Sequence, residues 1–207
     1  MTLISNKYKF IYIKTHRTSS TATQEFFKQF ADECYTKSST AVKKGFLYNH
    51  STAEEIRTFL IKNNREDVWN NYTKICIIRN PYATLLSLYG WFCIRNKTKI
   101  KDFNTFITNN NAVLNNTWVN NYKKKLFIGD NLIIDKYIIY EDKENTINNV
   151  LKFLDINSKY KKEKTKVNYV SPFCSDDYQK HFNEHSLQLC QKNSFFKKYC
   201  KQFNYSF

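Results

Sequence analysis

The residues with the clearest chemical potential form one short segment near the N-terminus, from Lys14 to Thr21. The segment reads Lys-Thr-His-Arg-Thr-Ser-Ser-Thr, so cations and hydroxyls lie close together. These are the side chains that bind phosphate and sulfate through charge-assisted hydrogen bonds. The segment has no glycine, whereas ATP-binding loops of the Walker type need the pattern Gly-x-x-x-x-Gly-Lys-Ser/Thr. It therefore predicts an anion-binding loop that lacks the ATP signature.

The flanking residues predict the elements that would position this loop. The apolar, β-prone run before it favours a strand over about 9–14. Apolar residues recur at helical spacing after it, at Ala22, Phe26, Phe27 and Phe30. We expect a helix over about 20–33, because a strand–loop–helix unit places an anion at a helix N-terminus. The alternative is a capped helix after an edge strand, with Thr18 or Ser19 as the N-cap.

A second candidate site begins at Arg79. It follows Lys74–Ile78, a continuous apolar run typical of a buried parallel strand, and Pro81 suits the first turn of the next helix. Open α/β sheets bind ligands at the carboxyl ends of their strands. Ser87 lies eight residues after Arg79, and an arginine with a hydroxyl suits a phosphate monoester. The alternative is that Arg79 pairs with a carboxylate and that Ser87 only packs.

The rest of the chain alternates strands with helices. Further strands are expected over about 45–48, 74–78 and 132–140. Further helices are expected over about 51–63, 81–95, 102–109, 113–124 and 144–154, with a mostly helical tail over 176–207. The lysine run 123–125 is expected to be a solvated loop or helix face. This alternation predicts an α/β fold with a central parallel sheet of about five strands flanked by helices, and the length predicts one domain over 1–207.

The charge of the chain is strongly positive. Lysine and arginine number 33 against 18 acidic residues, a formal charge of +15. Such an excess attracts polyanions, so nucleic acid, acidic polysaccharide and a phosphorylated cofactor all stay open. The hydrophobic content of 42% is enough for a packed core without disulfides.

Cysteines and apolar runs indicate the cellular setting. The six cysteines show no C-x-x-C spacing, so we expect free thiols in a reducing compartment and no metal site. No apolar run is long enough to span a membrane, and no signal-peptide pattern opens the chain. We therefore expect a protein without a membrane anchor that is cytoplasmic or otherwise soluble.

Taken together, the motifs resemble those of the PAPS-dependent sulfotransferases, in particular the carbohydrate sulfotransferase branch. Lys14-Thr15-x-x-Thr18-x-Ser20-Thr21 looks like the family's 5′-phosphosulfate loop, and Arg79-Asn80-Pro81 with Ser87 and Tyr89 looks like its 3′-phosphate motif. The two occur in the family's order. Further segments are similar to that branch: Tyr48–Ile56, Trp69-x-x-Tyr72, Tyr140-Glu141-Asp142 and Phe203–Phe207.

The resemblance implies a three-layer fold like that of the P-loop NTPases and a sulfuryl donor, 3′-phosphoadenosine 5′-phosphosulfate (PAPS), with PAP as product. It implies that Lys14 contacts the bridging oxygen and stabilises the leaving phosphate. The 5′-phosphosulfate would be held by the loop, namely Thr15, Thr18, Ser20 and Thr21 with backbone amides. Arg79 and Ser87 would hold the 3′-phosphate. His50 would be the general base for an acceptor hydroxyl, with a glycan favoured among small or acidic acceptors, and no metal is expected.

Several roles stay open on the residues themselves. His16, Arg17 and Ser19 lie inside the loop and are counted with the cofactor-binding residues; Arg17 could equally face the acceptor. His50 could be a surface residue ahead of a helix. Other bases to consider are His181, His185, Glu141 and Asp142. The basic stretch 159–166 could cover the 3′-phosphate, grip an acidic acceptor, or be a solvated charge run.

Three other classes compete with the sulfotransferase. One is a kinase of the P-loop type acting on a small hydroxyl, which the missing glycines argue against. Another is a basic, non-catalytic nucleic-acid-binding domain, which explains the charge but not the two anion-binding motifs. A third is a degenerate sulfotransferase that binds without turnover. No specific nucleic-acid partner is expected.

Overall fold

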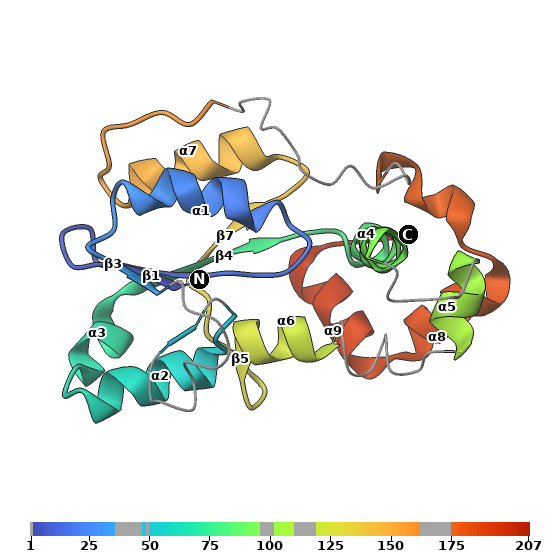
Figure 1. The fold of residues 1–207 in the computed structure, drawn as a ribbon, viewed down its shortest axis with the longest axis horizontal. Helices are drawn as coiled ribbons and strands as arrows, with labels where there is room; N and C mark the ends of the chain where they lie inside the picture. The colour runs from blue at the N-terminus through green and yellow to red at the C-terminus, as the bar shows by residue number, and fades with distance from the viewer. Residues whose placement is uncertain (1, 36–46, 49, 96–101, 110–118, 162–174) are drawn as a thin grey trace. The chain divides into compact units, whose positions relative to one another are not determined.

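A computed structural model describes residues 2–35, 47–48, 50–95, 102–109, 119–161 and 175–207 (Figure 1). The chain divides into two compact units. Unit 1 comprises residues 1–78 and 122–163, and unit 2 comprises residues 79–121 and 164–207. The single domain expected over 1–207 stays a prediction, because such a division does not show whether each unit folds alone.

Unit 1 contains a five-stranded sheet with the strand order β3-β1-β2-β4-β7. The strands are β1 (Thr2–Ser5), β2 (Phe10–Ile13), β3 (Glu33–Tyr35), β4 (Thr73–Ile78) and β7 (Lys136–Ile139). β2, β4 and β7 are parallel, as predicted, with Ile13 opposite Cys76 and Ile78 opposite Ile139. β1 is antiparallel to both β2 and β3, so the sheet is mixed and the prediction of a wholly parallel sheet needs this correction.

The antiparallel part was missed because its signals are weak. β1 has only four residues, all buried, and shows no alternation of apolar and polar side chains. The turn from β1 to β2 contains no glycine or proline, yet Lys9 adopts a left-handed φ of 50°. Such turns are normally recognised by residues that favour positive φ. The hairpin therefore forms through its pairing and burial and not through a strong turn sequence.

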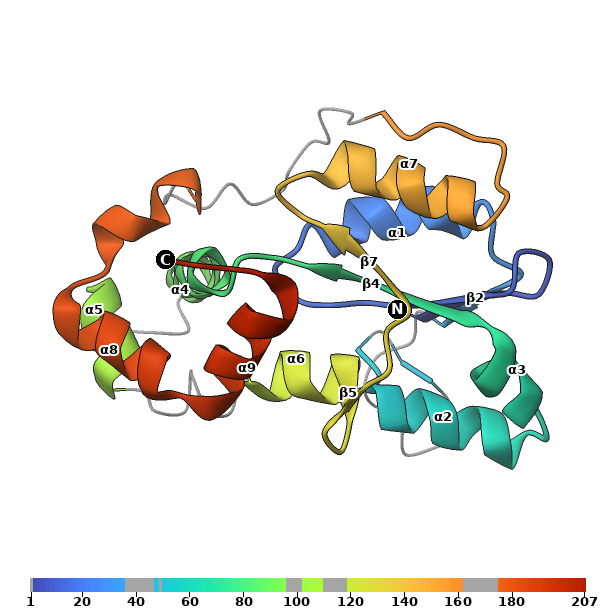
Figure 2. The ribbon, with the colours of Figure 1, turned by 180° about the vertical axis from the view of Figure 1, so that it is seen from behind.

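Helices lie on both faces of this sheet (Figure 1, Figure 2). One face carries α1 (Ser20–Lys28) and α7 (Lys143–Phe153), and the other carries α2 (Ala53–Lys62) and α3 (Glu66–Asn71). Beneath α1 the ring of Phe27 stacks on Tyr12 of β2 at 5.7 Å between centroids. Three-layer packing buries both faces of the central strands, which explains why β4 is a continuous apolar run.

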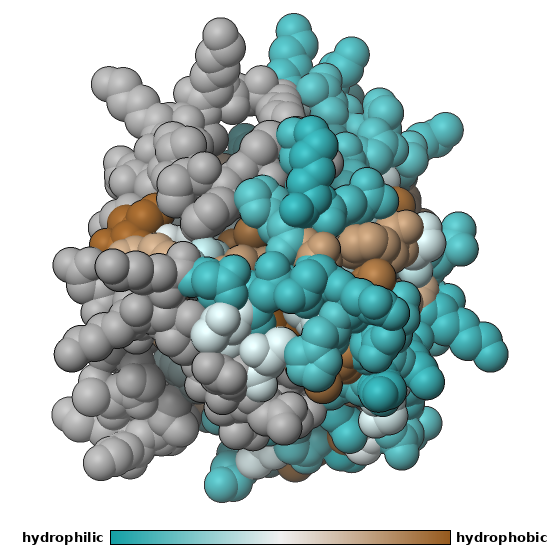
Figure 3. Space-filling view, turned by 90° about the vertical axis from the view of Figure 1, so that its right-hand side faces the viewer, coloured by the Kyte–Doolittle hydropathy of each residue, from teal (hydrophilic) through white to brown (hydrophobic). Residues whose placement is uncertain are grey.

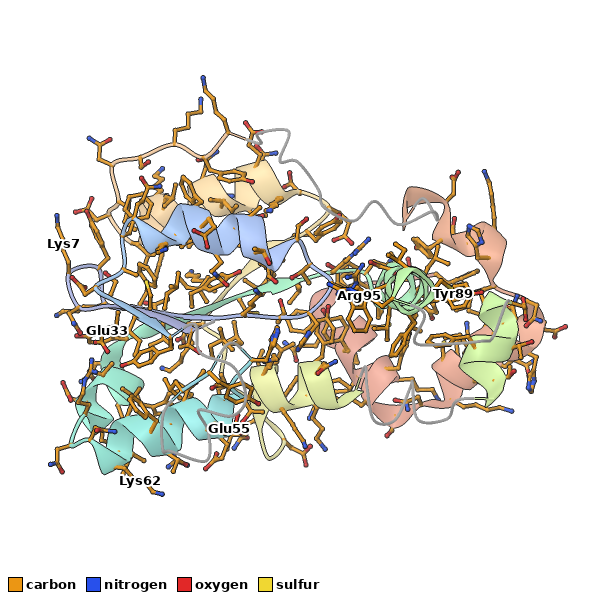
Figure 4. The ribbon with its side chains drawn as sticks, in the orientation of Figure 1. Lys7, Glu33, Glu55, Lys62, Tyr89 and Arg95 are labelled. Carbon is orange, nitrogen blue, oxygen red and sulfur yellow. The ribbon has the colours of Figure 1, made fainter. Side chains whose placement is uncertain are left out.

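Helix α2 begins where the sequence predicts a helix, and side-chain hydrogen bonds stabilise its first turn. The Thr52 hydroxyl accepts a hydrogen bond from the Glu55 amide at 3.2 Å, and the Glu55 carboxylate accepts one from the Thr52 amide at 2.6 Å. This capping box satisfies two N–H groups at the helix start. Figure 4 shows Glu55 at the N-terminal end of α2 and Lys62 at the other end. The predicted helix over 51–63 is thus confirmed.

Unit 2 is helical and packs around α4 (Pro81–Ile94). Among its described residues, unit 2 also contains α5 (Phe103–Asn109), the 3-10 helix η3 (Ser175–His181), α8 (Glu184–Lys192) and α9 (Ser194–Phe203). Pro81 lies in the first turn of α4, and the Asn80 side chain caps it by accepting from the amides of Tyr82 and Ala83 at 3.0 and 3.3 Å. The helix predicted from Pro81 and the helical tail are both confirmed.

Other boundaries differ from the sequence-based expectations. Leu47 and Tyr48 are not in a strand, and the rest of the strand expected over 45–48 lies outside the described residues. α1 ends at Lys28, earlier than expected, because β3 begins at Glu33. The segment 132–140 is divided between β7 and a separate hairpin, β5 (Phe127–Ile128) with β6 (Asn131–Leu132). The described part of the helix expected over 113–124 is α6 (Val119–Leu126).

The described residues include one largely hydrophilic face of the surface (Figure 3) and five of the six cysteines. On the face shown in Figure 3, hydrophilic side chains predominate among the described residues, and apolar ones gather in a narrow band. Cys34, Cys76, Cys93, Cys190 and Cys200 are free thiols, and Cys174 lies outside the described part. In that part of the chain, no helix combines the length and apolar character needed to cross a membrane.

Candidate functional site

The predicted anion-binding loop connects β2 to α1 in unit 1, so the strand–loop–helix arrangement is confirmed. Arg17 and Ser19 both adopt left-handed backbone, with φ of 57° and 50°, and Thr18 between them does not. Alternation of this kind turns neighbouring amide groups toward one side, which is the geometry of anion-binding nests. Ser19 occupies the N-cap position of α1 but its side chain makes no capping hydrogen bond. The alternative of a simple side-chain cap at Ser19 therefore does not explain the loop.

Lys14 is the first residue after β2 and is largely buried, with 9% of its surface exposed. Its ammonium donates a hydrogen bond to the Thr21 hydroxyl in the first turn of α1, at 3.2 Å. Burial lowers the pKa of Lys14, and the Glu25 carboxylate partly opposes this. The side chain thus links the start of the loop to the first turn of α1.

Thr15 and Thr18 are fully buried, and their hydroxyls are engaged within the protein. The Thr15 hydroxyl donates to the carbonyl of Ile77 on β4 at 2.7 Å and lies 3.1 Å from the Thr18 hydroxyl. The Thr18 hydroxyl also lies 3.4 Å from the Thr15 carbonyl. These contacts attach the loop to the neighbouring strand, so any contact of these two residues with an anion is best made by their backbone amides.

His16 and His50 lie together although they are far apart in the sequence. Their rings stack at 4.1 Å between centroids with 21° between planes. Burial is the largest cause that lowers the pKa of His16 to about 2 and that of His50 to about 3, and the nearby charges of Lys125 and Lys14 contribute to both values. Both imidazoles are therefore neutral at pH 7. Nδ1 of His50 is buried and has no hydrogen-bond partner among the described residues.

Lys125 on α6 is a site residue that the sequence did not reveal. It was expected to be solvated with the rest of the run 123–125; Lys123 and Lys124 are exposed, but Lys125 is only 2% exposed. Its ammonium donates to the carbonyls of His50 and Ser51, at 2.8 and 3.1 Å. Burial lowers its pKa to about 7, which Glu55 partly opposes. The only sequence signal was helical spacing, since Tyr122, Lys125 and Leu126 share one buried face.

Arg79 and Ser87, predicted to hold a 3′-phosphate, belong to unit 2. Arg79 directly follows β4 and is 4% exposed, and its backbone amide and carbonyl lie 3.3 and 3.2 Å from the Tyr199 hydroxyl. Ser87 lies on α4 and is 8% exposed. Lys14 belongs to unit 1, and whether these groups face one ligand stays a prediction.

The other sequence candidates have local roles in the structure. Glu141 and Asp142 are exposed, and Asp142 precedes α7 at the N-cap position. The His181 carbonyl accepts a hydrogen bond from the Asn104 amide group at 2.9 Å, and His185 lies in the first turn of α8. Of the basic stretch 159–166, the segment 162–166 lies outside the described residues. Among the residues that are described, none form a group of three or more His, Cys, Asp or Glu suited to a metal ion.

Comparison of the chain with protein-family models, with curated proteins and with solved structures gives no match.

Proposed function

We propose that this chain is a PAPS-dependent sulfotransferase that transfers the sulfuryl group to an acceptor hydroxyl, with a carbohydrate as the favoured acceptor class. The proposed fold relationship is to the three-layer P-loop NTPases. Two features support that relationship: the parallel strands β2, β4 and β7, and a phosphate-loop-like connection from β2 to α1. The resemblance of the motifs supplies the specific reaction.

One observation carries the proposal. The loop after β2 gathers positive charge: Lys14 and Lys125 each lower the pKa of both histidines, and Lys14 also lowers that of Lys125. Glu25 and Glu55 offset only part of this. Cations held together in a buried site repel one another, and a polyanion binding there relieves the repulsion. A phosphosulfate group against the loop amides and the N-terminus of α1 fits this charge and this geometry.

Each residue of the site has its own role in the proposed reaction. Lys14 stabilises negative charge that develops on the leaving phosphate, a contribution that is larger in the transition state than in the ground state. The amides of the loop from Thr15 to Thr21 hold the phosphosulfate oxygens. Arg79 and Ser87 hold the 3′-phosphate. This arrangement needs no ATP-type glycine, because Arg17 and Ser19 already adopt the left-handed backbone that glycine supplies elsewhere.

His50 is the proposed general base. It is neutral at pH 7, as a base must be, and its Nδ1 is buried, so Nε2 is the atom that would accept the acceptor's proton. A pKa of about 3 makes a weak base. An anion bound beside the imidazole favours its protonated form and raises the pKa. Binding of the donor would therefore prepare His50 for its role.

The test uses the purified chain with PAPS and a panel of mono- and oligosaccharides. We expect formation of PAP together with a sulfated product, and a rise in melting temperature with PAP that does not require magnesium. Binding of ligand at 100 times its Kd stabilises a protein by about 2.7 kcal/mol, which a thermal melt resolves. ATP with magnesium should give no comparable shift. A shift with ATP alone would favour the kinase, and salt-dependent binding to generic DNA without any response to PAP would favour the nucleic-acid-binding domain.

A further inference from the structure

The two stacked histidines belong to segments that are far apart in the sequence, and no sequence motif predicts that these segments lie together. His16 lies in the loop between β2 and α1, and His50 lies in the turn just before α2. The two rings nevertheless lie 4.1 Å apart between centroids. Nδ1 of His50 makes no hydrogen bond to any described residue, so this atom does not fix the ring. The backbone that carries each ring must therefore be held by other groups.

Helix α6 supplies those groups from two positions on one face. The Tyr122 hydroxyl donates to the His16 carbonyl at 2.8 Å. One turn further along, the Lys125 ammonium donates to the His50 carbonyl at 2.8 Å and to the Ser51 carbonyl at 3.1 Å. Residues three apart on a helix lie on the same face. One rigid helix face thus contacts the main chain of both histidine-bearing segments.

The burial of these two donors distinguishes this arrangement from ordinary surface contacts. Tyr122 is 1% and Lys125 is 2% exposed. A buried ammonium is costly unless it is hydrogen-bonded, so its geometry is tightly determined. Even the neutral amine keeps two N–H donors for the two carbonyls. On the His50 side, Ser51 fixes the turn further, because its hydroxyl accepts from the Tyr48 amide at 2.9 Å.

We propose that Tyr122 and Lys125 are positioning residues, which hold the main chain at His16 and His50 so that the two imidazoles stack and His50 presents Nε2 to the acceptor hydroxyl. Neither side chain takes part in the chemistry itself. The proposal rests on the proposed function only for the role of Nε2. The stacking and its dependence on α6 are properties of the chain alone.

The experiment compares three variants with the unaltered chain: Tyr122→Phe, Lys125→Met and, as matched control, Lys124→Met. Lys124 is adjacent and exposed. Without any ligand, the ring-proton NMR signals of His16 and His50, assigned through His16→Gln and His50→Gln, report the stacking. We expect both sets of signals to move in Tyr122→Phe and Lys125→Met and to stay in place in Lys124→Met. Thermal melts establish which variants fold.

Activity provides the second measurement. Displacement of the base by a fraction of an ångström to an ångström should lower kcat by about 10- to 100-fold. The comparison is made on kcat at saturating PAPS, because Tyr122→Phe also releases a carbonyl of the loop and Lys125→Met also removes a nearby cation, and both changes should raise the KM for PAPS. Tyr122→Phe keeps the ring and loses only the hydroxyl, so it decides the outcome if Lys125→Met does not fold. Unchanged histidine signals in Tyr122→Phe would overturn the proposal. If the ring-proton signals of His16 and His50 shift in Tyr122→Phe but the protein never transfers a sulfuryl group, the positioning role of Tyr122 is supported and the proposed function is refuted.

Discussion

At the scale of single residues, four basic groups around the loop after β2 have pKa values that are shifted downward. Lys14 and Lys125 have lowered pKa values, and His16 and His50 are shifted to about 2 and 3. Burial is the largest cause at every one of them. Groups with perturbed pKa values gather at functional sites, because chemistry needs charges held away from water. Substitution of each of these residues therefore tests its role in the proposed site.

Replacement of Lys14 by alanine should abolish most sulfuryl transfer. Loss of a group that stabilises developing charge lowers kcat by about 10²- to 10³-fold. Initial rates with PAPS and an active acceptor measure this, and PAP-dependent melting measures the loss of binding. The matched control is Lys28→Ala on α1, since Lys28 is exposed and its ion pair with Glu25, at 3.9 Å, contributes little. Equal losses of activity in both variants would argue that Lys14 has no special role.

The pKa of His50 should rise when PAP binds. The ligand-free value of about 3 reflects burial and neighbouring cations, and added negative charge favours the imidazolium. An NMR titration of the ring signals with and without PAP measures the change. His50→Asn should reduce kcat far more than PAP affinity. A His50 signal that titrates identically in both conditions would place the phosphates away from this imidazole.

At the scale of elements, the loop after β2 is attached to the sheet by side chains and not only by its ends. The Thr15 hydroxyl bonds to the Ile77 carbonyl on β4, and α6 contacts the carbonyls of His16 and His50. A loop fixed at several points keeps its amides in one arrangement. Such preorganisation is what makes charge stabilisation effective, because no reorganisation is needed during the reaction.

Thr15→Val should destabilise unit 1 and loosen the loop while keeping the shape of the side chain. A buried hydrogen bond contributes about 0.5–1.5 kcal/mol net, and the free energy of unfolding should fall by at least that amount because a buried carbonyl loses its donor. Urea unfolding measures the loss. Thr15→Ser keeps the hydroxyl and should retain most of the stability. If valine and serine behaved alike, the hydrogen bond to β4 would not be what stabilises the loop.

At the scale of the whole molecule, the chain carries a charge of +15, and the site adds histidines that are buried in the neutral form. Their folded-state pKa values of about 2 and 3 lie below the ordinary value of about 6.5. Between these values the unfolded chain binds more protons than the folded chain. The contribution of these two histidines to stability should therefore be full above about pH 6.5 and fall progressively toward pH 3.

Urea unfolding from pH 7.5, above that window, down to pH 5, roughly in its upper half, tests this expectation. The free energy of unfolding should decrease on acidification, and the decrease should be smaller in the double variant His16→Gln/His50→Gln. Bound PAP should also reduce the slope, because it raises the folded-state pKa values. A slope identical in the double variant would assign the acid sensitivity to other groups.

Those parts of the fold and of the candidate site that depend on neighbouring residues could be predicted from the sequence. Those that depend on residues far apart in the chain could not. The helix over 51–63, Pro81 in the first turn of α4, and the apolar run of β4 are set by neighbouring residues, and all were predicted. The strand β1 forms a hairpin with β2, and β3 pairs with β1, but β1 and β3 have weak signals of their own. Both were missed, so the sheet was expected to be wholly parallel.

The loop between β2 and α1, with its cations and hydroxyls, follows from the order of residues alone, because strand and helix periodicity are local properties of the chain. The inward turn of its hydroxyls, the stacking of His16 on His50, and the burial of Lys125 beside a solvated Lys124 depend on how the chain folds in three dimensions. The physical reason is that burial and charge proximity arise from contacts between distant segments. Those contacts set the pKa values on which the proposed chemistry depends.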